Sequence, residues 1–141
     1  MTGALVLLAA LVASAVVALV LRWKNGRFTA PTADGRERLT AEQIGSELGD
    51  RATLVQFSSS FCSPCRATRV LLLDVVSKEP GVVTVEINAE EHLDLVRELD
   101  IMRTPTVLVL DATGAVTTRA SGLPRRDQVT AALHRATSAH Q

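Results

Sequence analysis

The chain has 141 residues with 15 basic and 15 acidic side chains, which gives a formal net charge of zero at neutral pH. The excess of basic residues lies between Arg22 and Leu39, and the rest of the chain is acidic, so no basic stripe is present to neutralise nucleic-acid phosphates. Three Phe and no Tyr also leave few rings for stacking on bases, so we expect no nucleic-acid partner.

The first predicted element is a transmembrane anchor over residues 1–22. Residues 3–21 carry no charge, and as a helix they would span about 28 Å, close to the hydrocarbon thickness of a bilayer. The stretch is apolar on all sides and lacks the polar face of a helix that lies on a membrane surface. A cleaved signal peptide is disfavoured, because no basic residue precedes the run and no small-residue cleavage site ends it.

The charges after the apolar stretch predict its orientation. Arg22, Lys24 and Arg27 follow it, and no comparable charges precede it. The positive-inside rule then places the C-terminal side in the cytoplasm, and Trp23 stands where an interfacial aromatic ring is expected. We therefore expect a single-pass membrane protein whose folded part is cytoplasmic.

Residues 23–38 are predicted to form a short tether, because they are rich in turn-forming and charged residues and show no apolar periodicity. A folded domain is expected over residues 39–141. It opens with a short helix after Thr40, which together with Gln43 fits the pattern of a capping box.

Strand and helix patterns then alternate along the domain. Strands are predicted at 52–58, 82–88, 105–111 and 115–121. Helices are predicted from Cys62 to Lys78, over 89–100, and after Pro124. Strands joined through a helix favour a parallel right-handed crossover, and the turn "DATG" favours an antiparallel hairpin. The predicted fold class is α/β, with a mixed central sheet and helices on both of its faces.

Both cysteines of the chain, Cys62 and Cys65, stand where a helix is predicted to begin after a buried strand. The helix dipole and the free N–H groups of the first turn favour a thiolate there. Arg66 and Arg69 also favour the thiolate, but only weakly, because we expect both charges to be solvated. Two intervening residues allow the second sulfur to displace the first from a mixed disulfide. Pro64 fits the first turn, where its missing N–H costs little.

Two other interpretations of the cysteine pair are less favourable. A purely structural disulfide would close a very small loop and would stabilise the fold little. A zinc site would need two further ligands, from this chain or a second one, and the three histidines, His92, His134 and His140, show no paired spacing. We expect a redox dithiol and no metal.

Two stretches of the sequence resemble the thioredoxin family. "FCSPCR" after a buried strand resembles the thioredoxin active site, W-C-G-P-C-K. "RTPTVLVLDATGAV" resembles the thioredoxin segment with a cis-proline before a hairpin, and Gly122 resembles the glycine that ends that hairpin. The resemblance covers the chain from about Leu39 to its end. It implies a thioredoxin-like fold and thiol–disulfide exchange with partner proteins, without a bound cofactor.

The resemblance also implies roles for single residues. Cys62 would be the exposed nucleophile that attacks a disulfide of the partner, and Cys65 the more buried thiol that resolves the mixed disulfide. Pro105 would be the cis-proline beside the pair. Thr104 would offer backbone hydrogen bonds to an extended segment of the substrate.

Several positions differ from the usual thioredoxin pattern. Gln56 replaces a buried Asp that is thought to accept the proton of the resolving thiol, and an amide cannot act as a base. Glu86 stands where the family often has Lys; it could supply a carboxylate to the same pocket, but we expect it to face solvent. Ser58 and Phe61 replace tryptophans, and Ser63 replaces the glycine between the cysteines.

Three functional hypotheses follow. The favoured one is a membrane-anchored reductant of disulfide-containing proteins in the cytoplasm, which keeps dithiols reduced; a reductase or thiol carrier must then supply electrons. The second is an outward-facing oxidant, isomerase or maturation reductant of exported proteins. The third is a non-catalytic binding module, which the replacement of the buried Asp by Gln56 suggests.

Overall fold

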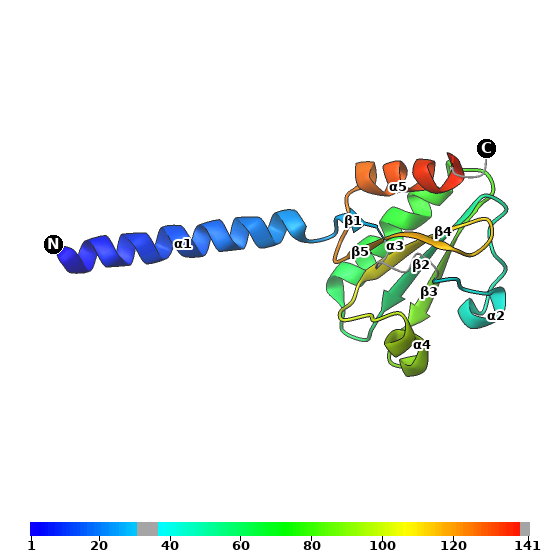
Figure 1. The fold of residues 1–141 in the computed structure, drawn as a ribbon, viewed down its shortest axis with the longest axis horizontal. Coiled ribbons are helices and arrows are strands. Elements are labelled where there is room, and N and C mark those ends of the chain that lie inside the picture. The colour runs from blue at the N-terminus through cyan, green and yellow to red at the C-terminus, as the bar shows by residue number, and fades with distance from the viewer. Residues whose placement is uncertain (31–36, 139–141) are drawn as a thin grey trace.

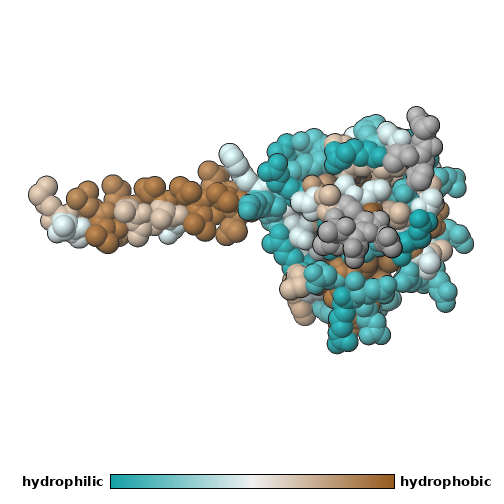
Figure 2. Space-filling view, in the orientation of Figure 1, coloured by the Kyte–Doolittle hydropathy of each residue, from teal (hydrophilic) through white to brown (hydrophobic). Residues whose placement is uncertain are grey.

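The computed structural model describes residues 1–30 and 37–138 of the chain. A long helix, α1 (Thr2–Lys24), extends away from a folded domain that contains the remaining elements (Figure 1). Every residue of α1 is exposed, and its surface is predominantly apolar (Figure 2). Within the described part of the chain it is the one helix whose length and composition would let it cross a membrane, and a signal sequence would have the same properties.

Five strands form a single mixed sheet in the order β1-β5-β4-β2-β3. They are β1 (Phe28–Thr29), β2 (Ala52–Ser58), β3 (Val82–Asn88), β4 (Thr106–Asp111) and β5 (Val116–Ser121). Strands β2 and β3 are parallel, whereas β4 is antiparallel to both β2 and β5. The predicted mixed α/β sheet is confirmed. Every side chain of the central strand β2 is buried, which explains why its sequence is mostly apolar rather than alternating.

Helices cover both faces of this sheet (Figure 1). They are α2 (Ala41–Ile44), α3 (Ser63–Val76), α4 (Leu93–Glu98) and α5 (Arg126–Ser138). One apolar cluster lies between the sheet and the helices α3 and α5, and includes Leu54, Leu72 and Val129. The other lies on the opposite face under α2 and α4, and includes Phe57 and Leu95.

The structure differs from the predicted tether at Phe28 and Thr29, which pair with Ala120 and Arg119 of β5. Arg38, at the end of the predicted tether, also forms an isolated bridge with Ala115. The prediction of an unstructured link was wrong at these positions, because such short pairings show no alternation in the sequence. Residues 31–36 of the predicted tether, like His140, lie outside the described residues.

The predicted boundaries of the helix from Cys62 to Lys78 are close to those of α3, whereas α4 is shorter than the predicted helix over 89–100, because residues 89–91 form a turn. The capping box is present: the backbone N–H of Gln43 donates to Thr40 Oγ1 over 3.2 Å, and Gln43 Oε1 accepts from the Thr40 N–H over 3.0 Å. Helix α2 ends at Ile44, since Gly45 adopts a left-handed conformation at its C-terminus. Helix α5 begins two residues after Pro124.

Candidate active site

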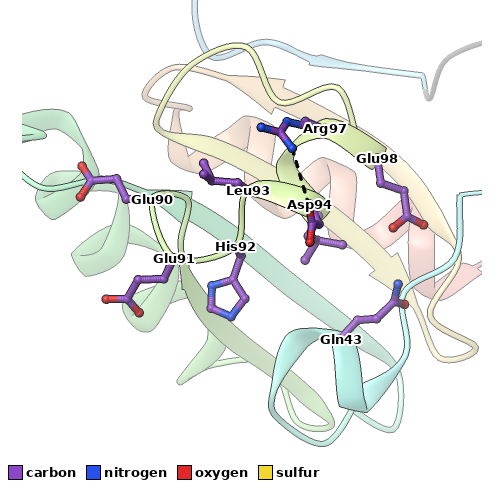
Figure 3. Close-up of a pocket in the computed structure, with 9 residues that line it drawn as sticks. Gln43, Glu90, Glu91, His92, Leu93, Asp94, Arg97 and Glu98 are labelled. Atoms are coloured by element: carbon purple, nitrogen blue, oxygen red, sulfur yellow. Dashed lines mark ion pairs between the residues drawn. The ribbon is translucent and has the colours of Figure 1, made fainter.

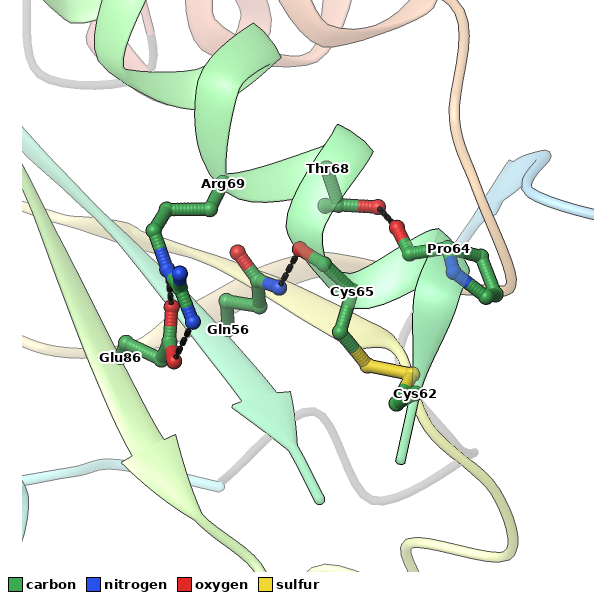
Figure 4. A network of polar contacts seen from close by, with 7 residues as sticks. All are labelled: Gln56, Cys62, Pro64, Cys65, Thr68, Arg69 and Glu86. Atoms are coloured by element: carbon green, nitrogen blue, oxygen red, sulfur yellow. Dashed lines mark hydrogen bonds and ion pairs between the residues drawn. A yellow bond between two sulfur atoms is a disulfide. The ribbon is translucent and has the colours of Figure 1, made fainter. Parts of the chain in front are cut away.

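The two cysteines form a disulfide at the N-terminal end of α3, with their Cα atoms 5.2 Å apart (Figure 4). Cys62 is the N-cap residue of the helix and is partly exposed, whereas Cys65 lies in the first turn and is only 2% exposed. Strand β2 ends four residues before Cys62 and so carries the chain to this point. A partner can therefore reach the first sulfur more easily than the second.

The first turn of α3 presents its residues to solvent. Ser63, Pro64 and Arg66 are all exposed, and Pro64 occupies one of the first two helical positions, where an absent N–H leaves no hydrogen bond unmade. Thr68 Oγ1 donates a hydrogen bond over 2.8 Å to the carbonyl of Pro64, which fixes this turn. The positive end of the dipole of α3 therefore lies at Cys62.

Gln56 contacts the same turn from beneath. Its side chain is 1% exposed, and its Nε2 donates a hydrogen bond over 2.8 Å to the backbone carbonyl of Cys65 (Figure 4). The amide thus connects the central strand β2 to the first turn of α3. Because this group cannot take up a proton near neutral pH, it positions Cys65 and does not act as its base.

Glu86 forms an ion pair with Arg69 beside this contact (Figure 4). Strand register places Glu86 opposite Gln56, and Arg69 Nη2 donates to Glu86 Oε1 over 2.5 Å. The hydrogen bonds from Arg69 hold the pKa of Glu86 below its ordinary value, although partial burial acts in the opposite direction. Glu86 is exposed, as predicted, yet the arginine ties its carboxylate to helix α3.

A second loop, before strand β4, is fastened to the loop that precedes Cys62. The peptide bond between Thr104 and Pro105 is cis, Pro105 is buried and Thr104 is half-buried. The hydroxyl groups of Thr104 and Ser59 share a hydrogen bond of 2.8 Å. Sequence reasoning did not identify Ser59, because nothing in its local sequence shows that it would meet a loop 45 residues further along.

Two hollows flank the Ser59–Thr104 hydrogen bond. One, of about 520 Å³, borders the disulfide and is lined by residues that include Ser59, Phe61 and Cys62. The other, of about 270 Å³, is mainly apolar and is lined by residues that include Met102 and Thr104. Phe61 has a positive φ of 58° and its side chain is fully exposed, and Met102 is 84% exposed. These surfaces could contact a partner that approaches Cys62.

A further hollow of about 570 Å³ surrounds the N-terminal end of α4 (Figure 3). It is lined by Gln43 of α2 and by most of the residues from 90 to 98, and Asp94 and Arg97 form an ion pair of 3.7 Å. The exposed imidazole of His92 lies here, 3.0 Å from the Asn88 carbonyl. The predicted site residues lie elsewhere, so this hollow is separate from the disulfide.

Comparison with known families agrees with this arrangement. The sequence model of the thioredoxin-like domain matches residues 41–137. The chain belongs to the thioredoxin family. A thioredoxin of the H5 type from Oryza sativa subsp. japonica is 27% identical over 90 residues, which are 64% of this chain and 65% of that protein. The mitochondrial thioredoxin of Bos taurus is 32% identical over 98 residues, which cover 64% of this chain and 58% of that protein.

The chain therefore spans about three fifths of the length of these thioredoxins.

Solved thioredoxin structures share its fold. A mutant thioredoxin from Halobacterium salinarum NRC-1 superposes with a TM-score of 0.56 and 17% identity, over 62% of this chain and 76% of that one. The oxidised mitochondrial thioredoxin 3 of Saccharomyces cerevisiae gives a TM-score of 0.54 and 17% identity, over 61% of this chain and 79% of that one.

Proposed function

We propose that this thioredoxin-family protein is a thiol–disulfide oxidoreductase that reduces disulfides in partner proteins. The observation that carries the proposal is the Cys62–Cys65 pair at the start of α3, with one accessible and one buried sulfur. The pair lies in a domain whose family catalyses this class of exchange, and it needs no bound cofactor because the two sulfur atoms themselves carry the electrons.

The exchange proceeds in two displacements. The Cys62 thiolate attacks one sulfur of the partner's disulfide, that S–S bond breaks, and the departing partner thiolate takes a proton from solvent. Cys65, after giving its proton to solvent, attacks the Cys62 sulfur of the mixed disulfide and releases the second partner thiol. The partner gains two electrons and two protons, and Cys62 and Cys65 become a disulfide. A reductase or thiol carrier must then return two electrons to the pair.

The surroundings of the pair support binding of an extended partner segment. Thr104 carries backbone groups beside the buried Pro105, and we propose that they pair with the partner in the manner of an added strand. The exposed ring of Phe61 and the side chain of Met102 would lose contact with water in the complex. The partner is thus expected to offer apolar side chains around its disulfide.

We further propose that α1 anchors the protein in a membrane with the folded domain in the cytoplasm. The basic residues Arg22, Lys24 and Arg27 at the C-terminal end of the helix support this orientation through the positive-inside rule. The cytoplasm keeps dithiols reduced, and the pair would therefore act there as a reductant.

A redox titration of the full chain in detergent micelles tests the function and its direction. Thiol alkylation after equilibration with glutathione or dithiothreitol buffers reports the state of the Cys62–Cys65 pair. A midpoint near or below about −250 mV supports a cytoplasmic reductant, and one near about −120 mV indicates an oxidant and contradicts the cytoplasmic orientation. A pair that forms no disulfide at any poise would overturn the redox function.

One observation favours a second candidate, a binding module that uses the thioredoxin surface without chemistry. Gln56 cannot serve as the base for Cys65, and its side chain instead holds the helix turn in place. Under this alternative the Cys62→Ser variant would support the cellular function as well as the wild type does. Loss of function in that variant, at unchanged protein level, would eliminate it.

A further inference from the structure

Helix α1 joins the domain at the same end of the sheet as the disulfide. Strand β2 runs toward the cysteines, and the antiparallel strand β4 begins beside its end, since Phe57 pairs with Thr106. Strand β5 ends at this edge, and β1 begins there, where Phe28 pairs with Ala120. The chain therefore passes from α1 into the sheet at its active-site end (Figure 1).

Hydrogen bonds connect this junction to the loop that carries Pro105. Asn25 follows α1 directly, and its Oδ1 accepts a hydrogen bond of 2.8 Å from Arg103 Nη2. The same Nη2 donates to the Ser121 carbonyl over 3.0 Å, and the backbone N–H of Gly26 donates to that carbonyl over 2.6 Å. Arg103 immediately precedes Thr104, so only Thr104 separates the residue that contacts Asn25 from Pro105.

The junction is also tightly packed. A Cβ atom on Gly122 would lie 1.8 Å from Asn25 Oδ1, and one on Gly26 would lie 2.0 Å from the carbonyl oxygen of Leu123. Both glycines are buried and have positive φ values of 93° and 73°. The Gly122 N–H donates to the Pro105 carbonyl over 2.7 Å. Asn25 therefore packs on Gly122, and Gly122 is hydrogen-bonded to Pro105 of the candidate active site.

Basic and aromatic residues surround the junction. A hollow of about 480 Å³ between α1 and α5 is lined by residues that include Arg22, Trp23, Arg27 and Arg125. Arginine side chains are attracted to anionic headgroups, and a Trp ring is favoured at the level of the headgroups. Arg22 and Trp23 belong to the anchor, and Arg27 follows it at the start of the domain, whereas the guanidinium of Arg125 pairs with Asp127. Because Arg27 lies on the domain side of the junction, we expect this part of the domain to lie against the bilayer surface.

We propose that the Cys62–Cys65 site acts on disulfides that integral membrane proteins hold close to the bilayer surface. The inference rests on the proposed function, in which the reduced pair gives two electrons to a partner disulfide and becomes a disulfide while the partner gains two thiols. With α1 in the bilayer, the domain lies beyond the C-terminal end of the helix (Figure 1). Because the chain enters the sheet at the end that carries the disulfide, we expect that end to lie nearest the membrane. Disulfides in that layer are presented at high local concentration and in a restricted orientation.

Single-turnover kinetics with the full chain in phosphatidylcholine–phosphatidylglycerol vesicles test the proposal. The reduced protein reacts with a disulfide-containing test peptide that is attached to a phospholipid by a short linker, or with the same peptide free in solution. Alkylation of Cys62 and Cys65 reports the reaction. One variant carries about twelve Gly and Ser residues between Lys24 and Asn25, which adds a flexible span of about 20 Å. The matched control carries the same insertion after Ala30, which leaves the contacts of Asn25 and β1 in place.

We expect the wild type and the control to reduce the lipid-linked peptide about tenfold faster than the junction variant, because the junction insertion dilutes and disorients the site. All three proteins should reduce the free peptide at equal rates. Equal rates of all three on the lipid-linked peptide, with normal reduction of the free one, would overturn the membrane-surface inference alone. Failure of all three proteins on both peptides would overturn the proposed function as well.

Discussion

The side-chain amide of Gln56 donates a hydrogen bond over 2.8 Å to the backbone carbonyl of Cys65, and so fixes the resolving cysteine to the central strand. Replacement of Gln56 by Leu should lower the free energy of unfolding by about 1 kcal/mol, because the bond is lost at a buried position. Urea denaturation of the oxidised full chain in micelles measures the change. The exposed control Glu98→Gln should remain within about 0.5 kcal/mol of the wild type, and an equal effect of both substitutions would contradict the positioning role.

Replacement of Gln56 by Asp would place an ionisable group under Cys65. Burial should raise the pKa of the introduced carboxyl toward neutrality, so that it accepts a proton from the resolving thiol only at higher pH. We expect the pH profile of the second displacement to gain an inflection, caused by the carboxyl, in addition to the one that deprotonation of Cys65 gives the wild type; rapid acid quench of the mixed disulfide measures it. The Gln56→Asn control should show no additional inflection, because it introduces no ionisable group. The same inflection in both variants would show that altered packing, and not the carboxyl, causes it.

The asymmetry in burial between the two cysteines predicts different effects of their substitution. A Cys65→Ser variant should accumulate a mixed disulfide between Cys62 and its partner, because the resolving thiol is absent. Non-reducing electrophoresis and mass spectrometry of the adduct would detect it. The Cys62→Ser variant is the control and should form no comparable adduct; equal trapping by both variants would refute the assignment of the nucleophile.

The ion pair between Arg69 and Glu86 predicts a pH-dependent contribution to stability. Because folding lowers the pKa of Glu86, its carboxylate stabilises the fold above the unfolded pKa of about 4.3, and this contribution disappears as the pH falls through the lowered folded pKa. The Glu86→Gln variant should be less stable by no more than about 1 kcal/mol near neutral pH, since the pair is partly exposed.

In strong acid the wild type and the Glu86→Gln variant should become equally stable. Denaturation curves at neutral and strongly acidic pH make the comparison, with Glu98→Gln as the exposed control. A stability difference that persists unchanged in acid would show that the carboxylate charge is not its cause.

Substitution by alanine should have different effects at Gly26 and at Gly45. Both have a positive φ, but a Cβ on Gly26 would meet the Leu123 carbonyl, whereas a Cβ on Gly45 would have no atom of the described residues within 4 Å. Gly26→Ala should therefore release β1 from β5 and speed proteolysis between α1 and α2. Gly45→Ala should cost only the local strain of about 1 kcal/mol. Similar cleavage rates in both variants would argue against tight docking of the junction.

Local signals in the sequence were sufficient for most of the fold. The apolar run of β2, the capping pair Thr40 and Gln43, and the turn after Asp111 each depend on residues that are neighbours in the chain. These signals set the type and order of the elements. The position of the cysteine pair followed from the same local information, because a buried strand leads directly into the helix that carries it.

Contacts between distant residues were harder to predict. Phe28 pairs with Ala120 across the sheet, yet its sequence neighbourhood is charged and rich in turn-forming residues. The link between Arg69 and Glu86 depends on the parallel register of β2 and β3 together with the rotation of α3, which periodicity does not fix. The hydrogen bond between Ser59 and Thr104 likewise arises only when two loops meet.

Strand β1 also protects an edge of the sheet. Its two residues cover the backbone of Arg119 and Ala120, which would otherwise offer unpaired N–H and C=O groups to another chain. A soluble fragment that begins at Leu39 would lack β1, and we expect it to self-associate through the exposed edge of β5. A fragment that begins at Asn25 would retain β1 and should stay monomeric, so the segment that follows the anchor decides whether the separated domain remains in solution.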